Sequence, residues 1–447
     1  MQQQIAGSTA AEIADSVRML RERGILQPGD LLPSVRELAA RLDINRNTAV
    51  SAYQQLAQAG IVRSRGRAGT VVAGGRPVPQ EGQAPDTVLR DIGSGNPDPS
   101  FIPDLAPALA RIVDRPVLYG EPVIDVELAD WSRAWLTDDL PRDDLQVTVT
   151  SGAVDAVERL LASALMRDDL VALEDPCFLS SIRTMRLGGY RTVSVPVDEA
   201  GMTVEGLRTA LDAGARAVVC TPRAQNPTGA NLSAGRAAEL RAVLADHPYV
   251  LLIEDDHFSM LATARYQTLI GQGHRRYALV RSVSKFLGPD MCLAVAGTDP
   301  TTAERLSMRL SPGTTWVSHL LQRLALAQLT DEDARARIAL AGAHYAERNA
   351  AFAAGLAERG IRVQHGDGLN LWVPTGVPAR EATEHLMRRG WLPRSGDDFL
   401  LDESAGPAHR LRLTVHDLDD AETERLLDDL VVATGHAGAL GSGRMAG

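Results

Sequence analysis

Between residues 145 and 284, short apolar runs alternate with stretches whose apolar residues recur at helical spacing. The apolar runs lie at 145–150, 169–175, 191–197, 216–222, 250–256 and 278–284. Strands that alternate with helices in this way form a mostly parallel sheet with helices on its faces. Long helices from about residue 340, followed by short strands at 368–374 and 410–415, predict a smaller α+β subdomain. The larger part of the chain is therefore predicted to have an α/β fold.

A second unit precedes this α/β body. Residues 74–85 are rich in Gly, Pro and Gln, a composition typical of a linker between independent units. A chain of 447 residues is long enough for more than one domain, and its 45% hydrophobic content is ample for a large core. We predict a head at residues 1–73, a linker at 74–88 and a body at 89–436.

Several classes of protein are disfavoured by the composition. No stretch approaches the ~20 unbroken apolar residues of a transmembrane helix, and the N-terminus lacks the basic start and apolar run of a signal peptide. Cys177, Cys220 and Cys292 are odd in number and widely spaced, which matches neither a disulfide framework nor a zinc site. We therefore expect no metal and a reducing cytoplasm.

The net charge of −11 is unevenly distributed along the chain. Residues 1–75 contain 9 Arg against 6 Asp and Glu, a net charge of +3. Residues 76–447 contain 37 basic against 51 acidic residues, a net charge of −14. A basic head on an acidic body indicates a head that binds an anion.

The head contains the pattern of a helix-turn-helix. Ser34 followed three residues later by Glu37 is a capping box at the start of one helix. After a tight turn, Asn45 caps a second helix that ends at Gly60. Two short helices joined this closely form a helix-turn-helix.

The start of the second helix of that motif enters the major groove of DNA. Arg46, Asn47 and Thr48 stand there, and arginine and threonine side chains can reach base edges or phosphates. Two short strands follow around a loop that forms a basic wing of three arginines, Arg63, Arg65 and Arg67. The alternative is a helical interaction domain with a solvated charged loop; the agreement of cap, turn, helix spacing and wing favours DNA binding.

These residues resemble the GntR-type winged helix over about residues 10–73. The matching positions are Pro28, Gly29, Asp30, Leu32, Pro33, Ser34, Arg36, Leu38, Ala39, Arg46, Thr48, Ala52, Tyr53, Leu56, Gly60, Gly69 and Thr70. By this resemblance, Arg36, Arg46, Thr48 and the wing around Gly66 contact DNA. The predicted DNA-contacting set is Ser34, Arg36, Arg46, Asn47, Thr48, Arg65, Gly66 and Arg67.

Lys285 is the only lysine in the chain; the other 45 basic residues of the 46 are arginine. An arginine stays protonated in proteins, whereas a lysine amine can become neutral and form a Schiff base with an aldehyde. Lys285 follows a predicted buried strand, and ligands gather at the carboxyl ends of parallel strands. Its position therefore indicates a ligand site, although a sequence depleted of lysine could also retain one by chance.

Other groups follow the neighbouring strands, and each has an ordinary structural explanation when taken alone. Ser151, Gly152 and Ala153 open a helix, where N–H groups can bind phosphate. Phe178 can cover a flat ring, and Asn226 can donate to an oxygen. Asp255, Asp256 and His257 end a buried strand, where a carboxylate needs a cationic partner such as a protonated pyridine. Together with Lys285 they predict a site for pyridoxal 5′-phosphate.

The order of these groups resembles the fold type I aminotransferases over about residues 90–435. The resemblance implies that Lys285 forms the Schiff base, Asp255 pairs with the ring nitrogen, Phe178 stacks on the ring and Asn226 contacts the ring hydroxyl. It places Ser151, Gly152, Ala153, Ser282 and Ser284 around the phosphate. It also implies that Tyr119 contacts the phosphate bound by the neighbouring subunit. Arg412 would clamp a substrate carboxylate, with Arg410 as its rival on the same strand.

Two positions depart from that family. Cys292 stands where an arginine usually binds the phosphate, and His257 stands where a tyrosine usually contacts the ring oxygen; His257 is still counted among the cofactor-binding residues. Losing a charge-assisted contact weakens binding by about 1.5–3 kcal/mol unless something compensates. The departures favour a cofactor that binds reversibly over an enzyme selected for turnover.

A GntR-type head joined to an aminotransferase-like body resembles the MocR/GabR family of bacterial transcription regulators. The resemblance implies a head-to-tail homodimer, operator DNA as partner, and a body that senses the cofactor or an amino compound. One alternative is an active aminotransferase carrying a DNA-binding head, because Lys285, Asp255 and Arg412 are all present. A third is a constitutive DNA-binding protein whose body only dimerises.

Overall fold

The computed structural model describes residues 5–27, 29–58, 61–64, 69–72, 82, 87–112, 116–310, 316–364, 366–401 and 406–435. The chain divides into two compact units, Met1–Pro79 and Gln80–Gly447. The division falls inside the segment predicted as linker, most of which lies outside the described residues. None of the helices in the described ranges is long and apolar enough to cross a membrane.

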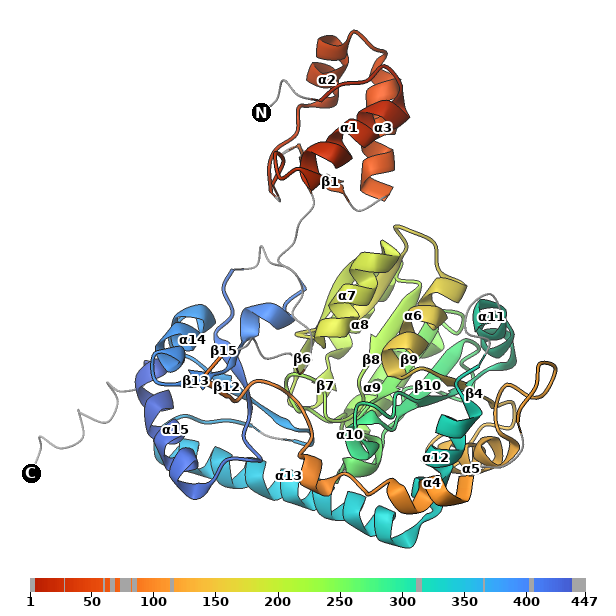
Figure 1. Cartoon of the computed structure of the whole chain (residues 1–447), viewed down its shortest axis with the longest axis vertical. Coiled ribbons are helices and arrows are strands. Elements are labelled where there is room, and N and C mark those ends of the chain that lie inside the picture. The colour runs from red at the N-terminus through yellow and green to blue at the C-terminus, as the bar shows by residue number, and fades with distance from the viewer. Residues whose placement is uncertain are drawn as a thin grey trace, which may run out of the picture. The chain divides into compact units, whose positions relative to one another are not determined.

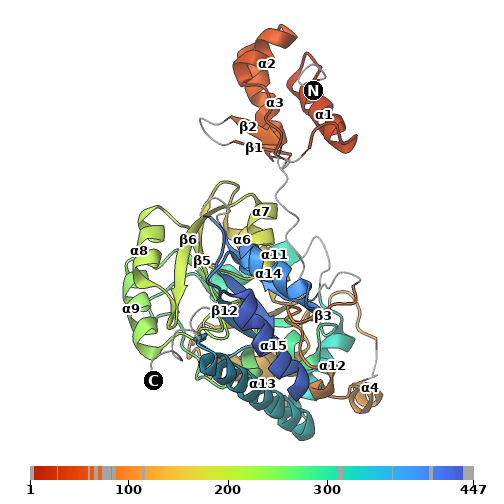
Figure 2. The ribbon, with the colours of Figure 1, turned by 90° about the vertical axis from the view of Figure 1, so that its left-hand side faces the viewer.

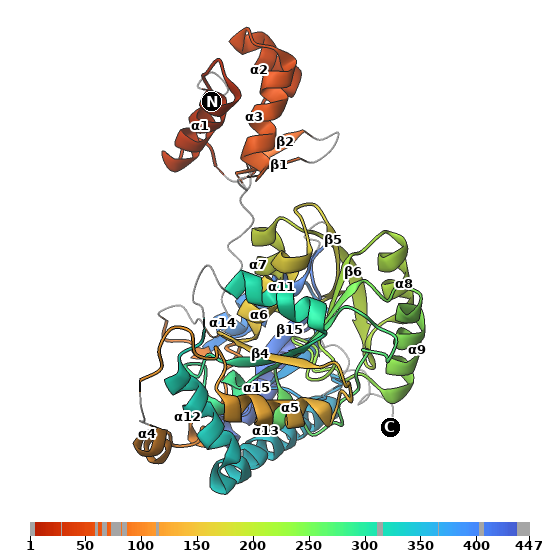
Figure 3. The same ribbon diagram turned by 90° about the vertical axis from the view of Figure 1, so that its right-hand side faces the viewer.

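The first unit is a bundle of three helices followed by a small antiparallel hairpin. Its elements are α1 (Ala10–Glu22), α2 (Val35–Leu42), α3 (Arg46–Gln58), β1 (Val62–Ser64) and β2 (Thr70–Val72). α3 packs against both α1 and α2, as Figures 2 and 3 show. Ile13, Val17, Leu38 and Leu56 are completely buried in the shared core. The predicted winged helix-turn-helix is confirmed.

Local capping explains why α2 begins and ends where it does. The Ser34 hydroxyl accepts a hydrogen bond from the Glu37 N–H at 3.2 Å, and the Glu37 carboxylate accepts from the Ser34 N–H at 2.8 Å. This is the capping box that the sequence predicts. Asp43 ends the helix in the left-handed conformation, with φ of 51°. The turn to α3 is short because Asp43 ends α2 and Asn45, two residues later, caps α3.

The second unit contains a sheet of eight strands with the order β4-β11-β10-β9-β8-β5-β6-β7. The strands are β4 (Gln146–Thr150), β5 (Leu170–Asp175), β6 (Arg191–Asp198), β7 (Gly201–Met202), β8 (Ala217–Cys220), β9 (Leu251–Asp256), β10 (Tyr277–Ser282) and β11 (Ala294–Thr298). Only β11 and β7 run against the others. The predicted mostly parallel sheet is confirmed, and the carboxyl ends of β4, β5, β8, β9 and β10 lie at one edge.

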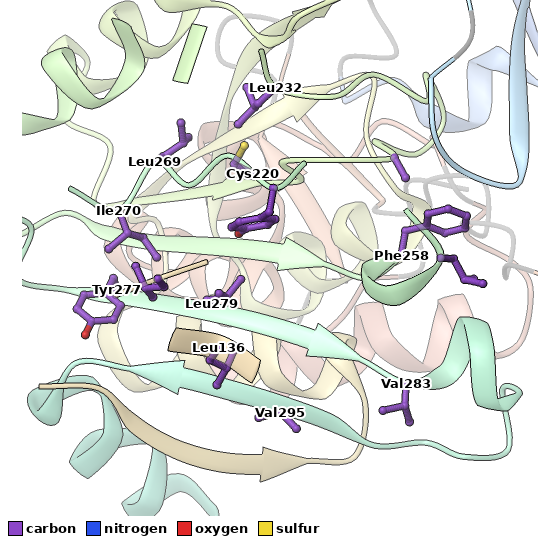
Figure 4. Packing of buried hydrophobic residues seen from close by; sticks show 14 of the residues in the cluster. Leu136, Cys220, Leu232, Phe258, Leu269, Ile270, Tyr277, Leu279, Val283 and Val295 are labelled. Carbon is purple, nitrogen blue, oxygen red and sulfur yellow. The ribbon is translucent and has the colours of Figure 1, made fainter. Parts of the chain in front are cut away.

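Helices cover both faces of this sheet (Figures 1 and 3). They are α4 (Ala106–Ile112), α5 (Val126–Thr137), α6 (Ala153–Ala164), α7 (Leu179–Gly188), α8 (Val204–Asp212), α9 (Ala234–Ala245), α10 (Ser284–Leu287), α11 (Pro300–Leu310) and α12 (His319–Thr330). Figure 4 shows Leu136 of α5 near Leu279 and Val295, side chains of neighbouring strands. Burial of this contiguous cluster holds the strand ends in place.

A smaller subdomain completes the second unit. It contains a sheet of order β12-β15-β14, formed by Asn370–Pro374, Arg410–Thr414 and Arg394–Ser395. β3 (Arg90–Asp91) pairs in parallel with β13 (Trp391–Leu392), so residues from the start of the unit join this subdomain. Its helices are α13 (Glu332–Glu358), α14 (Ala379–Met387) and α15 (Asp420–Ala433), and Figure 2 shows α15 near α13 and β12. The predicted α+β subdomain is confirmed.

Candidate functional site

Lys285 lies on the short helix α10, which directly follows β10. Its Nζ donates a hydrogen bond to the carbonyl oxygen of Gly95 at 2.7 Å. The side chain is partly buried and lines a small cavity together with Asn226, His257 and Asn370. The structure thus brings Lys285, Asn226 and His257, three of the predicted cofactor residues, to one cavity at the carboxyl edge of the sheet.

Asp255 is a buried carboxylate on β9, directly beside Val280 of β10 in the sheet register. Its Oδ1 atom is inaccessible to solvent and has no hydrogen-bond partner among the described residues. Burial, together with the nearby charge of Asp256, raises the pKa of Asp255 to about 7. A buried carboxylate without a cation is costly. The proton on a pyridine nitrogen would satisfy this atom, so the geometry fits the predicted cofactor.

Asp256, the next residue, is completely buried in the opposite electrostatic environment. Arg223 donates to both of its oxygens at 2.8 and 2.9 Å, and Arg281 donates at 2.9 Å. Burial alone would raise the pKa of Asp256, but the charges of Arg223 and Arg281 outweigh it and hold the pKa below its ordinary value. Arg281 also contacts Asp139 and donates to the Trp135 carbonyl. Asp256 is therefore a fixed anion rather than a cofactor ligand.

Of the predicted phosphate-binding residues, Ser151, Gly152 and Ala153 lie at the start of α6, and Ser282 and Ser284 lie at the junction of β10 and α10. Gly152 is the N-cap, with φ of 92° and no side-chain cap, so the first N–H groups of the helix are available. The Ser282 hydroxyl accepts from the Ser284 N–H at 3.2 Å. The Cys292 Sγ atom donates to the Ser151 carbonyl at 3.2 Å. A Cβ added to Gly152 would lie 3.2 Å from the same sulfur atom. Cys292 thus lies against the predicted phosphate cup.

The structure separates the two arginines that the sequence left as rivals. Arg412 is completely buried; its Nη1 donates to Asn226 Oδ1 at 3.1 Å and its Nη2 to the Gly93 carbonyl at 2.6 Å. Its guanidinium also lies 4.9 Å from the centre of the Phe399 ring. Arg410 is exposed, donates weakly to the Trp372 carbonyl at 3.4 Å and lines a different groove. Of these two arginines, only Arg412 contacts a residue predicted to bind the cofactor, namely Asn226.

Two aromatic residues are placed less directly. Phe178 is half-buried at the N-terminus of α7, at the carboxyl end of β5, the position that the sequence predicts. Tyr119 is 91% exposed and contacts Trp316, with ring centroids 5.4 Å apart. It does not line the cavity around Lys285.

Several residues at this site have no place in the sequence prediction. They are Asp155 and Arg159 on α6, Arg223 after β8, Arg281 on β10, and the backbone of Gly93 and Gly95. Arginine is too common in this chain for its number alone to mark Arg223 or Arg281. Gly93 and Gly95 could have indicated from the sequence that the backbone approaches the site closely here, because glycine allows such an approach.

In the first unit, the predicted DNA-contacting residues cluster at the starts of α2 and α3. Ser34, Arg36, Arg46 and Asn47 are exposed, and Thr48 is half-exposed. Asn45 caps α3, since its Oδ1 accepts from the Asn47 N–H at 2.8 Å. Arg65, Gly66 and Arg67, as well as the side chain of Arg63, lie outside the described residues. In the described residues, no group of His, Cys, Asp and Glu could hold a metal ion.

Comparisons with protein families match both units. Residues 9–72 match the family of bacterial regulatory proteins of the gntR type, and residues 93–430 match aminotransferase class I and II. The domains are therefore a DNA-binding head and a pyridoxal phosphate-binding body.

Two curated relatives are regulators linked to vitamin B6. The vitamin B6 salvage pathway transcriptional repressor PtsJ of Salmonella typhimurium is 45% identical over 427 residues, 95% of this chain and 98% of the relative. The pyridoxine biosynthesis transcriptional regulator PdxR of Corynebacterium glutamicum is 31% identical over 268 residues, 57% of each chain.

Solved structures match the body. A kynurenine aminotransferase of Pyrococcus horikoshii matches with a TM-score of 0.69 and 19% identity, covering 77% of this chain and 91% of that chain. An α-aminoadipate aminotransferase of Thermus thermophilus matches with a TM-score of 0.68 and 22% identity, covering 79% and 93%. At these identities the likeness shows the fold alone.

Proposed function

The chain belongs to the family of GntR-type regulators with an aminotransferase class I and II body, and we propose that it controls transcription in response to pyridoxal phosphate. The observation that carries this proposal is the match of head and body together, over 95% of the chain, to a repressor of a vitamin B6 salvage pathway. The buried Oδ1 of Asp255, on the strand next to the one that leads to Lys285, supports it, because a pyridine N–H would satisfy this atom.

Each residue has a role in this proposal. Lys285 would hold the cofactor through its aldehyde, and Asp255 would accept the hydrogen bond of the ring nitrogen. Asn226 and His257 lie where they can contact the ring oxygen, and Phe178 covers the ring. Ser282, Ser284 and the start of α6 hold the phosphate. When bound, the cofactor supplies an aldehyde that can capture an amine.

We propose further that two chains form a head-to-tail homodimer in the cytoplasm. Tyr119 is 91% exposed and would reach the phosphate of the neighbouring subunit. A symmetric dimer would present two recognition helices to two half-sites. The free thiols of Cys177, Cys220 and Cys292 are compatible with a reducing compartment.

The effector is proposed to be the cofactor itself, an amino acid or an amine. Buried Arg412 in contact with Asn226 favours a carboxylate ligand, because a guanidinium binds a carboxylate through two parallel hydrogen bonds. The same observation supports a second candidate function, transamination, since Lys285, Asp255 and Arg412 lie in one unit. Multiple turnovers with an amino donor and a keto acceptor would establish that second function.

A gel shift with the purified, cofactor-free chain on the DNA upstream of its own gene tests the proposal. We expect pyridoxal phosphate to change the DNA affinity of the wild type, and Lys285→Ala to abolish that response. Arg410→Ala is the matched control, because it removes a cation from the same unit outside the Lys285 cavity. Equal DNA binding with and without cofactor would reject the cofactor as effector.

A further inference from the structure

The proposed phosphate cup already contains a carboxylate. The Ser151 N–H donates to Asp155 Oδ2 at 3.1 Å. Asp155 is in the first turn of α6, where the N–H groups of a helix attract an anion. A side chain of the protein therefore occupies one of the donors nearest the place predicted for the phosphate.

Arg159 binds this carboxylate from the next turn of the helix. Its Nε donates to Asp155 Oδ1 at 2.6 Å, and its Nη1 donates to the Arg309 carbonyl on α11 at 3.2 Å. Both side chains remain 24% exposed, so solvent or a ligand can reach them.

The cup lacks the cation that the aminotransferase resemblance predicts there. The Cys292 side chain is exposed, but partial desolvation, reinforced by the charges of Asp155 and Asp290, raises the pKa of its thiol. The thiol is therefore neutral, and it cannot balance the negative charge of a phosphate. Arg159 is a cation linked to the cup through Asp155.

We propose that the Asp155–Arg159 pair sets the affinity of the cup for the cofactor phosphate. The phosphate competes with Asp155 for the Ser151 N–H, and Arg159 supplies the positive charge that Cys292 does not. This inference rests on the binding of pyridoxal phosphate by the body. It explains how the site retains a phosphate without the usual arginine and still releases it.

Binding constants for pyridoxal phosphate and for pyridoxal, which has no phosphate, test the pair in the full chain. We expect Asp155→Asn to tighten pyridoxal phosphate binding about tenfold and Arg159→Gln to weaken it about tenfold, since one charge is removed near a phosphate. Neither variant should change the affinity for pyridoxal. Glu205→Gln, in an exposed pair with Arg208, is the control and should change neither constant.

The outcomes separate clearly. If either variant shifts both ligands equally, the pair acts on the fold and not on the phosphate, and the proposal is wrong. Unchanged pyridoxal phosphate binding in Asp155→Asn also overturns it, and this near-isosteric variant remains informative if Arg159→Gln fails to fold. DNA is absent from the assay, so the result does not depend on the regulatory function.

A second inference comes from a different set of contacts, at residues 93–96, which we call the strap. Its four successive carbonyls all accept hydrogen bonds. The donors are Arg412 to Gly93 at 2.6 Å, the Gly82 N–H to Ser94 at 2.9 Å, Lys285 to Gly95 at 2.7 Å and His416 to Asn96 at 2.9 Å.

Two of these donors are the cations assigned to the ligands. Condensation of the Lys285 amine with an aldehyde would form a C=N bond and release water with two amine hydrogens, so the nitrogen would keep at most one N–H and its hydrogen bond to Gly95 would be weakened or lost. A carboxylate that binds Arg412 through its Nη2 would compete with the Gly93 carbonyl for this nitrogen. Ligand binding therefore removes the hydrogen bonds on both sides of Ser94.

The Ser94 carbonyl accepts a hydrogen bond from the N–H of Gly82, a residue of the segment predicted as the linker to the head. The packing here is close. A Cβ added to Gly82 would lie 2.8 Å from Asn96 Oδ1, and a Cβ added to Gly93 would lie 2.7 Å from the backbone nitrogen of Arg394. A displacement of the strap therefore has to displace Gly82 or break its hydrogen bond.

We infer that the strap couples the cofactor site to the linker. Lys285 and Arg412 hold the strap, and the strap holds Gly82; a ligand that takes these donors would release it. This inference deepens the proposed function and rests on it, because it names the route by which the cofactor changes the placement of the heads.

Hydrogen exchange of peptides that contain Gly82 and residues 93–96, with DNA affinity measured in parallel, tests the route in the full chain. Lys285→Met removes the donor at similar length, while Lys285→Arg keeps a donor that cannot react with an aldehyde. We expect pyridoxal phosphate to accelerate exchange in the wild type about tenfold, through loss of one charge-assisted hydrogen bond. Lys285→Met should exchange fast without cofactor, and Lys285→Arg slowly with or without it.

Arg337→Gln is the matched control, because Arg337 donates to the Ser100 carbonyl at 2.7 Å, beyond the strap. It should leave exchange at Gly82 unchanged. If the cofactor changes DNA affinity but not this exchange, the strap is not the route, and the regulatory function stands. If the cofactor changes neither, the regulatory function fails, and slow exchange in Lys285→Met would reject the strap as well.

Discussion

Asp255 and Asp256 are neighbours on β9, yet their carboxylates have opposite properties. Asp256 accepts hydrogen bonds from Arg223 and Arg281, whereas the Oδ1 of Asp255 is buried without a partner among the described residues. Successive residues of a strand point to opposite faces of the sheet, so adjacent side chains can meet different surroundings. One aspartate is therefore structural and the other is available to a ligand.

This contrast predicts how stability depends on pH. Burial raises the pKa of Asp255 to about 7, well above its ordinary value. Between about pH 4 and about pH 7, the folded chain holds a proton that the unfolded chain has released. The free energy of unfolding should therefore fall as pH rises through this window, by at most about 1.4 kcal/mol per pH unit for this group. Asp255→Asn should show a shallower fall.

Urea unfolding of both cofactor-free proteins at about pH 5 and about pH 7 measures the difference. Glu174 and Glu254, which are also buried and have pKa values raised to about 7 by burial, contribute equally to both proteins and cancel. Identical slopes for wild type and variant would contradict the assignment of a partnerless carboxyl at Asp255.

Arg412 and Arg410 make a second test at the residue scale. Arg412→Leu should weaken binding of an amino acid by about 1.5–3 kcal/mol, roughly 10- to 150-fold, because a charge-assisted contact is lost. The amine of the same skeleton without a carboxylate should bind this variant and the wild type alike. Arg410→Leu is the control, since Arg410 is exposed and lines another groove. Titrations of the cofactor-loaded chain measure these affinities; equal losses for acid and amine would exclude the carboxylate role.

At the scale of elements, caps decide where the helices of the head begin. Thr9 and Glu12 form a capping box at α1 like that of Ser34 and Glu37 at α2, with the Thr9 hydroxyl accepting from the Glu12 N–H at 3.2 Å. Thr9 lies outside the predicted DNA-contacting set, so its cap can be tested without changing DNA contacts.

We expect Thr9→Ala to destabilise the head by about 1 kcal/mol, because the N-cap hydrogen bond is lost. Thr9→Ser keeps the hydroxyl and should behave like the wild type. Hydrogen exchange of the backbone in α1 measures the effect in the full chain. Equal protection in Thr9→Ala and Thr9→Ser would show that the cap does not limit the stability of α1.

The strand β11 shows where element prediction from the sequence was incomplete. Residues 294–298 form a short segment in which Ala294, Ala296 and Gly297 alternate with the β-branched Val295 and Thr298, so the local preference for a strand is weak. They nevertheless form the strand between β10 and β4, because all five are buried on the sheet. Tertiary burial overrides the weak local preference here.

At the scale of the whole molecule, the chain is two compact units connected through a short segment. The Gly-, Pro- and Gln-rich residues 74–85, about 12 residues, span at most about 40 Å when fully extended. We propose that this length restricts the separation of the two heads in a dimer, and with it the spacing of the half-sites.

Insertion of a flexible Gly-Ser segment of about the same length into residues 74–81 should therefore relax the spacing, because the accessible span increases with linker length. Footprinting on operators whose half-sites are moved apart by whole helical turns measures this, and sedimentation establishes the dimer. A wild-type footprint over half-sites many turns apart, without looping, would contradict the restriction. Replacement of the same residues without a change in length is the control.

The amino-acid sequence was sufficient to predict the helices and strands and the kinds of chemical group at the site. Periodicity, caps and the strand–helix alternation depend on neighbouring residues, so the winged helix-turn-helix, the mostly parallel sheet and the placement of Lys285 at a strand end could be predicted. The one lysine of the chain could also be recognised from the sequence alone as a candidate for forming a Schiff base.

Which side chains contact one another could be learned only from the three-dimensional packing of the chain. The choice of Arg412 over Arg410, the pairing of Arg159 with Asp155 and the contacts of Lys285 with Gly95 join residues up to 190 positions apart, or side chains whose direction the sequence leaves open. Burial and hydrogen-bond pairing arise from packing between distant elements, and these set the charge state of Asp255 and the bonds that hold the strap.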